Sequence, residues 1–213
     1  MDDADLFILH DDLQYTKQDW RNRNRIKTPA GLEWLTVPVS HRATRQLIQE
    51  TEIAAGDWPV RHRRKITEAY RAAPYFSEVF PLIEKALSAP SGLLSDLNAH
   101  LLRSIADFLG ITTPIVWSRD YQSAGVRNEK LVSLLVSAGA TRYISGPSAR
   151  AYIDEALFEA AGIPVLFKEY SYAPYEQLWG PFAGEVSVID LLFNMGPASR
   201  GLIKSRVPLP FGL

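Results

Sequence analysis

Short apolar runs alternate with helical segments over the C-terminal half of this chain, and this alternation constrains the fold more than any other feature. Strand-like runs occupy residues 115–117, 142–144 and 165–167, and helical segments occupy residues 128–138 and 149–161 between them. Strands joined through a helix run parallel, because the chain must cross back over the sheet before the next strand begins. We therefore predict an α/β protein with a mostly parallel sheet and flanking helices.

The N-terminal half is predicted to contribute further strands and helices to the same domain. Apolar runs at residues 5–10 and 34–39 indicate strands, and helical patterns cover residues 59–71, 74–87, 93–109 and 187–194. A length of 213 residues suits one domain, so we expect a single domain over residues 1–213. The last dozen residues have the composition of a loose tail.

The composition excludes several kinds of site and partner. The formal net charge is −1, so anion binding must come from local clusters rather than from a globally basic surface. The absence of cysteine rules out disulfides, thiolate metal sites and cysteine nucleophiles. No apolar run approaches the roughly 20 residues that a membrane-spanning helix needs, so we predict no membrane insertion and a cytoplasmic location.

Cations alternate with other residues in R-N-R-N-R-I-K, residues 21–27. In a strand, a period of two places Arg21, Arg23, Arg25 and Lys27 on one face and the asparagines on the other. Arginine forks suit phosphate or carboxylate, and neighbouring guanidiniums repel one another unless an anion lies opposite. A solvated edge strand protected by its charges is the alternative. We favour anion binding, because arginine and asparagine dominate over lysine.

Two aspartates, Asp11 and Asp12, follow the first predicted strand, where the sites of α/β proteins gather. They could bind a metal, orient an amine or act as a base, and we take them as the candidate catalytic residues. Capping of a turn, or pairing with the arginines just downstream, is the alternative. Three further residues of the same segment are candidate substrate or phosphate ligands: Gln14, Lys17 and Asn24.

The segment S-G-P-S-A-R, residues 145–150, lies between a predicted strand and a predicted helix. Small residues let backbone N–H groups approach a ligand, and the dipole of a helix attracts an anion to its N-terminus. The segment contains neither a Walker nor a dinucleotide-binding pattern, and ordinary capping by a serine is the alternative. Its place after a strand favours phosphate binding by Ser145, Gly146, Ser148 and Arg150.

The remaining polar clusters indicate no reaction. The basic run at residues 61–65 is typical of a solvated helix face. None of the four histidines has the spacing of a metal site, so we predict no metal ligands in the protein. Read from its residues alone, the sequence supports an α/β protein with an anion-binding N-terminal segment.

Several segments together carry a family resemblance. The segment D-D-L-Q-Y-T-K-Q-D-W-R-N-R-N-R-I-K-T-P (11–29) precedes W-L-T-V-P-V (34–39) and A-Y-R-A-A-P-Y-F (69–76). Downstream are Y-I-S-G-P-S-A-R-A-Y-I-D (143–154), Y-x-P-Y-x-Q-x-x-G-x-F (172–182) and S-x-I-D-L-L-F-N-x-G (187–196). In this order and over nearly the whole chain, the sequence resembles the WbqC-like family of bacteria.

The resemblance implies a role in surface-polysaccharide assembly. Family members are similar to a protein of O-antigen gene clusters for which a glycine-transferase role has been suggested. The implied function is a transferase that moves glycine to an activated amino-sugar, with a nucleotide-sugar as substrate and aminoacyl-tRNA as a donor. The cations of residues 21–27 would then hold phosphates of the nucleotide-sugar, of ATP or of aminoacyl-tRNA, with Mg²⁺ as a companion of a phosphorylated substrate. One of the aspartates, Asp11 or Asp12, would position the amine.

Two other functions remain open from the sequence. One is an ATP-dependent enzyme that transfers a nucleotidyl group or activates a carboxylate. The other is a non-enzymatic module that binds RNA or an anionic glycan, although the near-neutral net charge counts against broad nucleic-acid binding. The sequence does not indicate an oligomeric state.

The resemblance also concerns the beginning of the chain. Related sequences usually carry about twenty further residues upstream, comprising a strand and a loop of the form H-Q-P-x-Y-x-P-W-x-G-Y. This chain begins M-D-D-A-D-L-F-I-L, which corresponds to the end of the helix after that loop. We expect the sequence to start at an internal methionine, with an N-terminal strand of the sheet missing from it; a shortened sequence, or a family member that lacks this segment, is the alternative.

Overall fold

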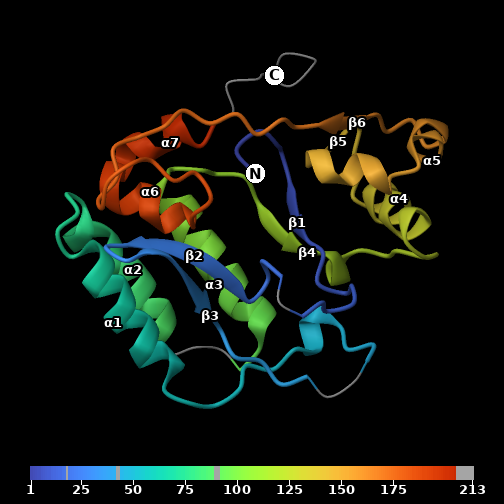
Figure 1. Ribbon diagram of the computed structural model, residues 1–213. Coiled ribbons are helices and arrows are strands. Elements are labelled where there is room, and N and C mark those ends of the chain that lie inside the picture. Colours follow the sequence, from blue (N-terminus) through green and yellow to red (C-terminus); the bar gives the residue numbers. More distant parts are fainter. Residues whose placement is uncertain (18, 42–43, 89–91, 205–213) are drawn as a thin grey trace. The chain divides into compact units, whose positions relative to one another are not determined.

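The structure divides into two units that are assembled from separate stretches of the chain. The computed structural model describes residues 1–17, 19–41, 44–88 and 92–204 (Figure 1). The parallel-strand unit contains Met1–His10 and Thr113–Ala173, and the helical unit contains Asp11–Thr112 and Pro174–Ile203. The single domain expected over residues 1–213 stays a prediction, and the tail expected at the C-terminus lies outside the described residues from residue 205 onward.

The parallel-strand unit contains two parallel strand pairs. Strand β1 (Phe7–Leu9) pairs with β4 (Ile115–Trp117), and β5 (Tyr143–Ser145) pairs with β6 (Val165–Phe167). The helices of this unit are α4 (Asn128–Ser137) and α5 (Glu155–Ala160), with short 3₁₀ helices η2 (Ser118–Asp120) and η3 (Pro147–Ala151). Parallel pairing with intervening helices confirms the predicted α/β class.

One predicted helix of this unit is wrong over its first part. The sequence indicates a helix over residues 149–161, but the chain forms η3 first and the α-helix begins only at Glu155. Asp154 has the extended backbone that a helix N-cap adopts. Ile153 packs against the apolar cluster of Leu135, Phe158 and Ile163, and this packing holds the residues between the two helices in a non-helical path.

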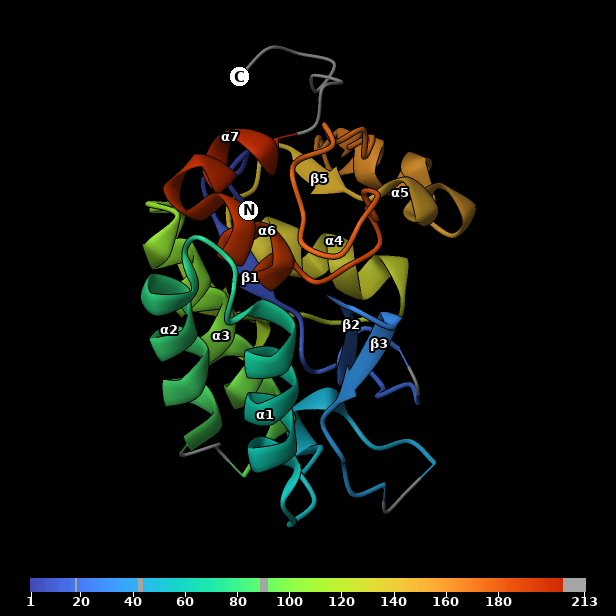
Figure 2. The same cartoon turned by 60° about the vertical axis from the view of Figure 1, so that its left-hand side comes forward.

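The helical unit combines helices with one antiparallel hairpin. Helices α1 (Trp58–Tyr70), α2 (Phe76–Ser88) and α3 (Leu94–Phe108) lie side by side (Figures 1 and 2). The hairpin joins β2 (Arg23–Thr28) to β3 (Gly31–Thr36). The remaining elements are η1 (Ile48–Glu50), α6 (Val188–Met195), η4 (Gly196–Ala198) and α7 (Ser199–Leu202). Strand β3 ends before Pro38, because proline has no N–H to donate to a ladder.

Stacked aromatic rings join α6 to the helices beside it. The ring of Phe193 lies 4.7 Å from that of Tyr70 and 5.6 Å from that of Phe76, both stacked. Tyr70, Phe193 and Ile26 of β2 are fully buried. The core of the helical unit therefore lies where α1, α2, α6 and the inner face of β2 meet, and it fixes the position of the hairpin within the unit.

Candidate functional site

The hairpin sorts its side chains onto two faces. Arg25 lies opposite Trp34 in the antiparallel register, so these side chains share a face. Arg23 and Lys27 lie on the same face by alternation, whereas Ile26 points to the other face and is fully buried. The strand thus places cations beside an aromatic ring and uses its opposite face for the core.

Arg23, Arg25 and Trp34 of this hairpin form, together with Trp20 just before it, a surface that we call the arginine–tryptophan surface. The guanidinium carbon of Arg23 lies 4.3 Å from the ring centre of Trp34, and that of Arg25 lies 5.4 Å from Trp34 and 6.0 Å from Trp20. The two indole rings are 5.5 Å apart, and Trp20 is 64% exposed. With Asp19 these residues line a shallow hollow of about 280 Å³.

The two guanidiniums retain unused hydrogen-bond donors. Each guanidinium carries five N–H donors. Arg25 donates to Glu185 at 2.5 Å, and no acceptor for the guanidinium of Arg23 is found in the part of the chain that the structure describes. Both cations instead lie against Trp34, and the Nε of each is buried without a hydrogen-bond partner. The surface can therefore offer a planar ring and charged donors to one ligand.

Four other residues predicted from the same segment have different surroundings. Arg21 precedes β2 and pairs with Asp19, and it also donates to the Thr16 hydroxyl at 2.8 Å. Gln14 donates to the backbone carbonyl of Thr44 at 2.8 Å. The side chain of Asn24 accepts a bond from the N–H of Arg25, and Lys17 is exposed. None of these four lines the hollow.

Lys27 is buried and holds a loop. Its ammonium donates to Gln177 at 3.0 Å, to the carbonyl of Gly180 at 3.1 Å and to that of Pro181 at 2.6 Å. An ammonium has three protons, so protein oxygens take all of its donors. Lys27 is therefore not part of the proposed binding surface. Its hydrogen bonds hold the segment of residues 177–181 in place.

The buried carboxylate of Asp190 in α6 accepts hydrogen bonds from several segments that carry the family resemblance. Tyr70 and Tyr175 each donate a hydroxyl to it at 2.8 Å, and Gln177 donates an amide N–H at 2.8 Å. Asn194 donates to the backbone carbonyl of Asp190 at 2.7 Å. Sequence reasoning did not single out these residues, although Y-x-P-Y-x-Q and S-x-I-D-L-L-F-N were part of the resemblance.

Both tyrosines of this cluster remain protonated donors. Burial raises the pKa of Tyr70 well above its usual value, and the negative charge of Asp190 raises it further. The same two causes, in the same order, raise the pKa of Tyr175. The cluster is therefore a satisfied hydrogen-bond network at neutral pH, and we assign it to holding the loop of residues 174–183 against α6.

The two candidate catalytic aspartates lie at the beginning of the helical unit. Asp11 is buried, and its backbone carbonyl accepts a bond from the N–H of Gln49 at 2.9 Å. Asp12 is half-buried. Their catalytic role stays a prediction.

The second predicted phosphate group, Ser145 to Arg150, belongs to the parallel-strand unit. Gly146 precedes η3 rather than an α-helix, so the helix dipole expected for this group is missing. A side chain at Gly146 would meet the hydroxyl of Tyr170 at 3.1 Å. Ser148 is exposed, and the guanidinium of Arg150 lies 4.2 Å from the ring centre of Phe167. Phosphate binding by this group stays a prediction.

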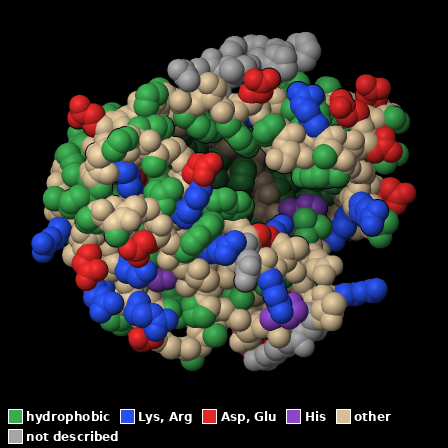
Figure 3. Space-filling model, viewed as in Figure 1, with side chains coloured by type: hydrophobic (Ala, Val, Ile, Leu, Met, Phe, Trp, Pro, Cys, Tyr) green, Lys and Arg blue, Asp and Glu red, His purple; other side chains and the backbone are tan. Residues whose placement is uncertain are grey.

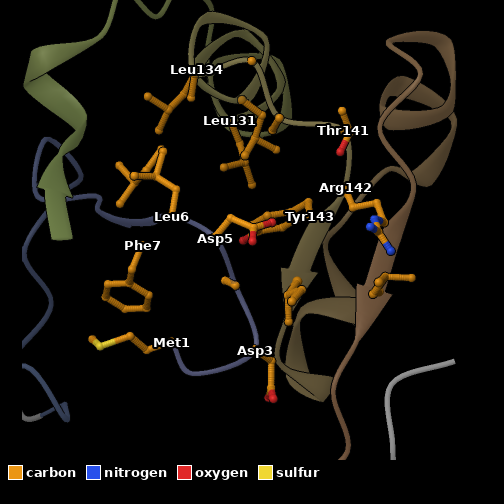
Figure 4. Close-up of a pocket in the computed structure, with 18 of the residues that line it drawn as sticks. Met1, Asp3, Asp5, Leu6, Phe7, Leu131, Leu134, Thr141, Arg142 and Tyr143 are labelled. Atoms are coloured by element: carbon orange, nitrogen blue, oxygen red, sulfur yellow. The ribbon is translucent and has the colours of Figure 1, made fainter. Parts of the chain in front are cut away.

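The parallel-strand unit also contains a cavity of about 430 Å³. Leu131 and Leu134 of α4 extend toward it from one side, and Leu6, Phe7 and Tyr143 lie around it (Figure 4). Its lining is mostly apolar and combines residues next to β1 with residues of α4 and β5.

Basic side chains of α1 lie beside acidic groups. Arg61 pairs with Asp57 and Arg64 with Glu68 on α1, and Figure 3 shows basic and acidic side chains side by side on the face drawn there. This arrangement fits the solvated helix face expected for residues 61–65. The arginine–tryptophan surface differs in one respect, because Arg23 forms no ion pair among the described residues.

Among the described residues, no three histidine, aspartate or glutamate side chains are grouped so that they could hold a metal ion. Mg²⁺ bound through the phosphates of a substrate needs only one or two protein carboxylates. In the same part of the chain, no helix is both long and apolar enough to cross a membrane.

The fold and the hairpin surface define an α/β protein with an exposed arginine–tryptophan site. The model of the WbqC-like protein family matches residues 1–201, and the chain belongs to that family. It is 47% identical over 196 residues to "Uncharacterized protein Rv1507c" of Mycobacterium tuberculosis (strain ATCC 25618 / H37Rv), covering 91% of this chain and 85% of the relative. No solved structure matches the chain.

Proposed function

We propose that this protein is a transferase that acts on a phosphate-activated sugar in surface-polysaccharide (O-antigen) assembly. The observation that carries the proposal is the arginine–tryptophan surface, where two guanidiniums with unused donors lie against an exposed indole ring. Membership of the WbqC-like family supports the same proposed function. The proposed location is the cytoplasm, and the proposed substrate is a nucleotide-sugar.

The chemistry of this surface suits such a substrate. Guanidinium forks bind phosphate oxygens through two parallel hydrogen bonds. An exposed indole offers a flat apolar face on which a base or sugar ring can lie. Arg23 and Arg25 would hold the phosphates, and Trp20 and Trp34 would hold the ring.

The proposed reaction is glycyl transfer to an amino-sugar. The unprotonated amine attacks the carbonyl carbon of an activated glycyl ester, an amide bond forms, and the ester bond to the donor alcohol breaks. One of the aspartates, Asp11 or Asp12, takes the proton of the amine and passes it to the oxygen of the departing alcohol. Aminoacyl-tRNA is the proposed donor, and the alcohol that leaves is then its terminal ribose.

Thermal unfolding in the presence of ligands tests the binding step. We expect a nucleotide-sugar at about ten times its Kd to stabilise the protein by about 1.4 kcal/mol, which raises Tm by a few degrees. Replacement of both Arg23 and Arg25 by alanine should abolish this shift. R64A removes an exposed arginine of α1 and should retain it.

Parallel titrations separate the alternative functions. Stabilisation by ATP with release of pyrophosphate would indicate the nucleotidyl-transfer or carboxylate-activating enzyme, and stabilisation by RNA or glycan alone would indicate a binding module. Transfer of labelled glycine to the sugar completes the test. If no phosphate-bearing ligand raises Tm, both enzyme functions are rejected.

A further inference from the structure

Glu185 places a carboxylate on the arginine–tryptophan surface. Its oxygen accepts a hydrogen bond from Arg25 at 2.5 Å, although the Glu185 side chain is 80% exposed and that of Arg25 only 21%. No other partner of the Glu185 carboxylate is found in the described part of the chain. An exposed ion pair of this kind contributes little stability and exchanges readily with a competing anion.

The backbone around Glu185 is held more firmly than its side chain. The N–H of Ser187 donates to the carbonyl of Arg25 at 2.7 Å, and the N–H of Ala183 donates to Gln177 at 2.8 Å. Lys27 binds the same loop through the carbonyl of Pro181. The carboxylate is therefore kept within reach of Arg25 at a high local concentration, whereas its side chain can rotate away without unfolding the loop.

We propose that Glu185 is a specificity-determining residue that competes with the ligand for Arg25 and restricts the site to ligands carrying a diphosphate. This inference rests on the proposed function, because it concerns the same surface. A monocarboxylate carries the same charge as Glu185 and also loses its free motion on binding, so it cannot displace the internal group. A diphosphate offers more charge and can contact Arg23 and Arg25 together.

The indole rings narrow the ligand class further. Trp20 and Trp34 flank the guanidiniums, with Trp34 within 6 Å of both. A diphosphate that binds the arginines therefore places its attached group beside these rings. A nucleoside diphosphate meets both requirements, since its phosphates and its base supply the charge and the flat ring.

Charge-neutral variants test this inference by calorimetric titration at fixed ionic strength. E185Q removes the competing charge and keeps the size of the side chain. We expect E185Q to bind inorganic pyrophosphate about three- to tenfold more tightly than the wild type. The matched control E176Q removes an exposed charge of the same loop that does not pair with Arg25, and its affinity should equal that of the wild type.

Further probes identify the ligand and the source of any change. Acetate should bind E185Q measurably and should not bind the wild type. A nucleoside diphosphate should bind every protein more tightly than pyrophosphate does, except a W20A/W34A variant, which lacks both indole rings. Because Glu185 is exposed, E185A serves as a second variant that should behave like E185Q.

The outcomes separate this inference from the proposed function. Equal pyrophosphate affinity in wild type, E185Q and E185A, or no binding by any of them, overturns the role of Glu185. Tighter pyrophosphate binding by E185Q without binding or turnover of nucleotide-sugars supports the role of Glu185 and rejects the transferase.

Discussion

Two cations of β2 show that the role of a residue depends on how deeply its side chain is buried as well as on its sequence position. Arg25 and Lys27 are two residues apart and share a face of the strand. Arg25 lies over Trp34 at the surface, whereas Lys27 is buried with its ammonium bonded to Gln177 and two carbonyls. Alternation determines the face, but the loop that covers one end of the strand determines which cation can meet a ligand.

His62 of α1 is a buried histidine that lies beside a backbone carbonyl and an aromatic ring. Its Nε2 lies 3.1 Å from the carbonyl oxygen of Thr36, and its ring contacts that of Trp58 edge-on at 5.2 Å. The pKa of His62 is lowered from 6.5 to about 4, mainly by burial; the carbonyl of Thr36 opposes this shift, and the charges of Arg61 and Lys65 add to it. The neutral imidazole is therefore the form that the fold holds at neutral pH.

The shifted pKa of His62 predicts loss of stability in mild acid. Between pH 6.5 and about 4 the unfolded chain binds a proton that the folded chain does not, so the free energy of unfolding falls as pH falls through this window. We expect a loss on the order of 2 to 3 kcal/mol from this group by pH 4. Urea unfolding of wild type and H62Q between pH 7 and pH 4 measures it.

The control for this measurement is H100Q, which replaces an exposed histidine of α3. H100Q should follow the pH dependence of the wild type, and H62Q should show a flatter one. Parallel loss of stability in all three proteins would assign the acid sensitivity to other groups.

At the scale of elements, α6 and its C-terminus are closely packed in the helical unit. The helix buries Phe193 against Tyr70 and Phe76, and it presents Asp190 to the tyrosine network. Gly196 ends it with φ 51° and ψ −131°, a backbone conformation that residues with a side chain seldom adopt. A Cβ at Gly196 would also lie within 2.5 Å of ring atoms of Tyr75.

Substitution of Gly196 should therefore be strongly destabilising. We expect G196A to lower the free energy of unfolding by about 2 to 4 kcal/mol, because the backbone is strained and the Tyr75 ring must move. Gly201 of α7 is the matched control, since a Cβ there meets no atom within 4 Å. G201A should be neutral or stabilising by up to about 1 kcal/mol. Denaturant midpoints compare the two variants, and similar values would refute the steric argument.

At the scale of the whole molecule, charge is balanced overall and concentrated locally. The formal net charge is −1, and acidic groups pair with many of the basic ones on α1. The arginine–tryptophan surface is a local exception in the helical unit. A local cluster of this size suits a small anionic ligand better than a long polyanion, whose binding requires many phosphate contacts.

This charge distribution predicts weak binding to RNA. At about 0.15 M salt we expect a random single-stranded RNA to show no binding at micromolar protein concentrations. Filter binding or fluorescence anisotropy over a salt series measures it. Tight binding with a steep salt dependence would contradict the expectation and favour the RNA-binding module over the transferase.

The sequence by itself determined the α/β class and the alternation that places Arg23 and Arg25 on one face, because strand and helix periodicities are local properties of the chain. Sequence alone did not show that η3 replaces the first part of a helix, since packing of Ile153 decides that. Likewise, only the tertiary structure brings Glu185 to Arg25 and places protein oxygens around the ammonium of Lys27. Those contacts join segments far apart in the chain, and their positions follow from the shared core rather than from any local pattern.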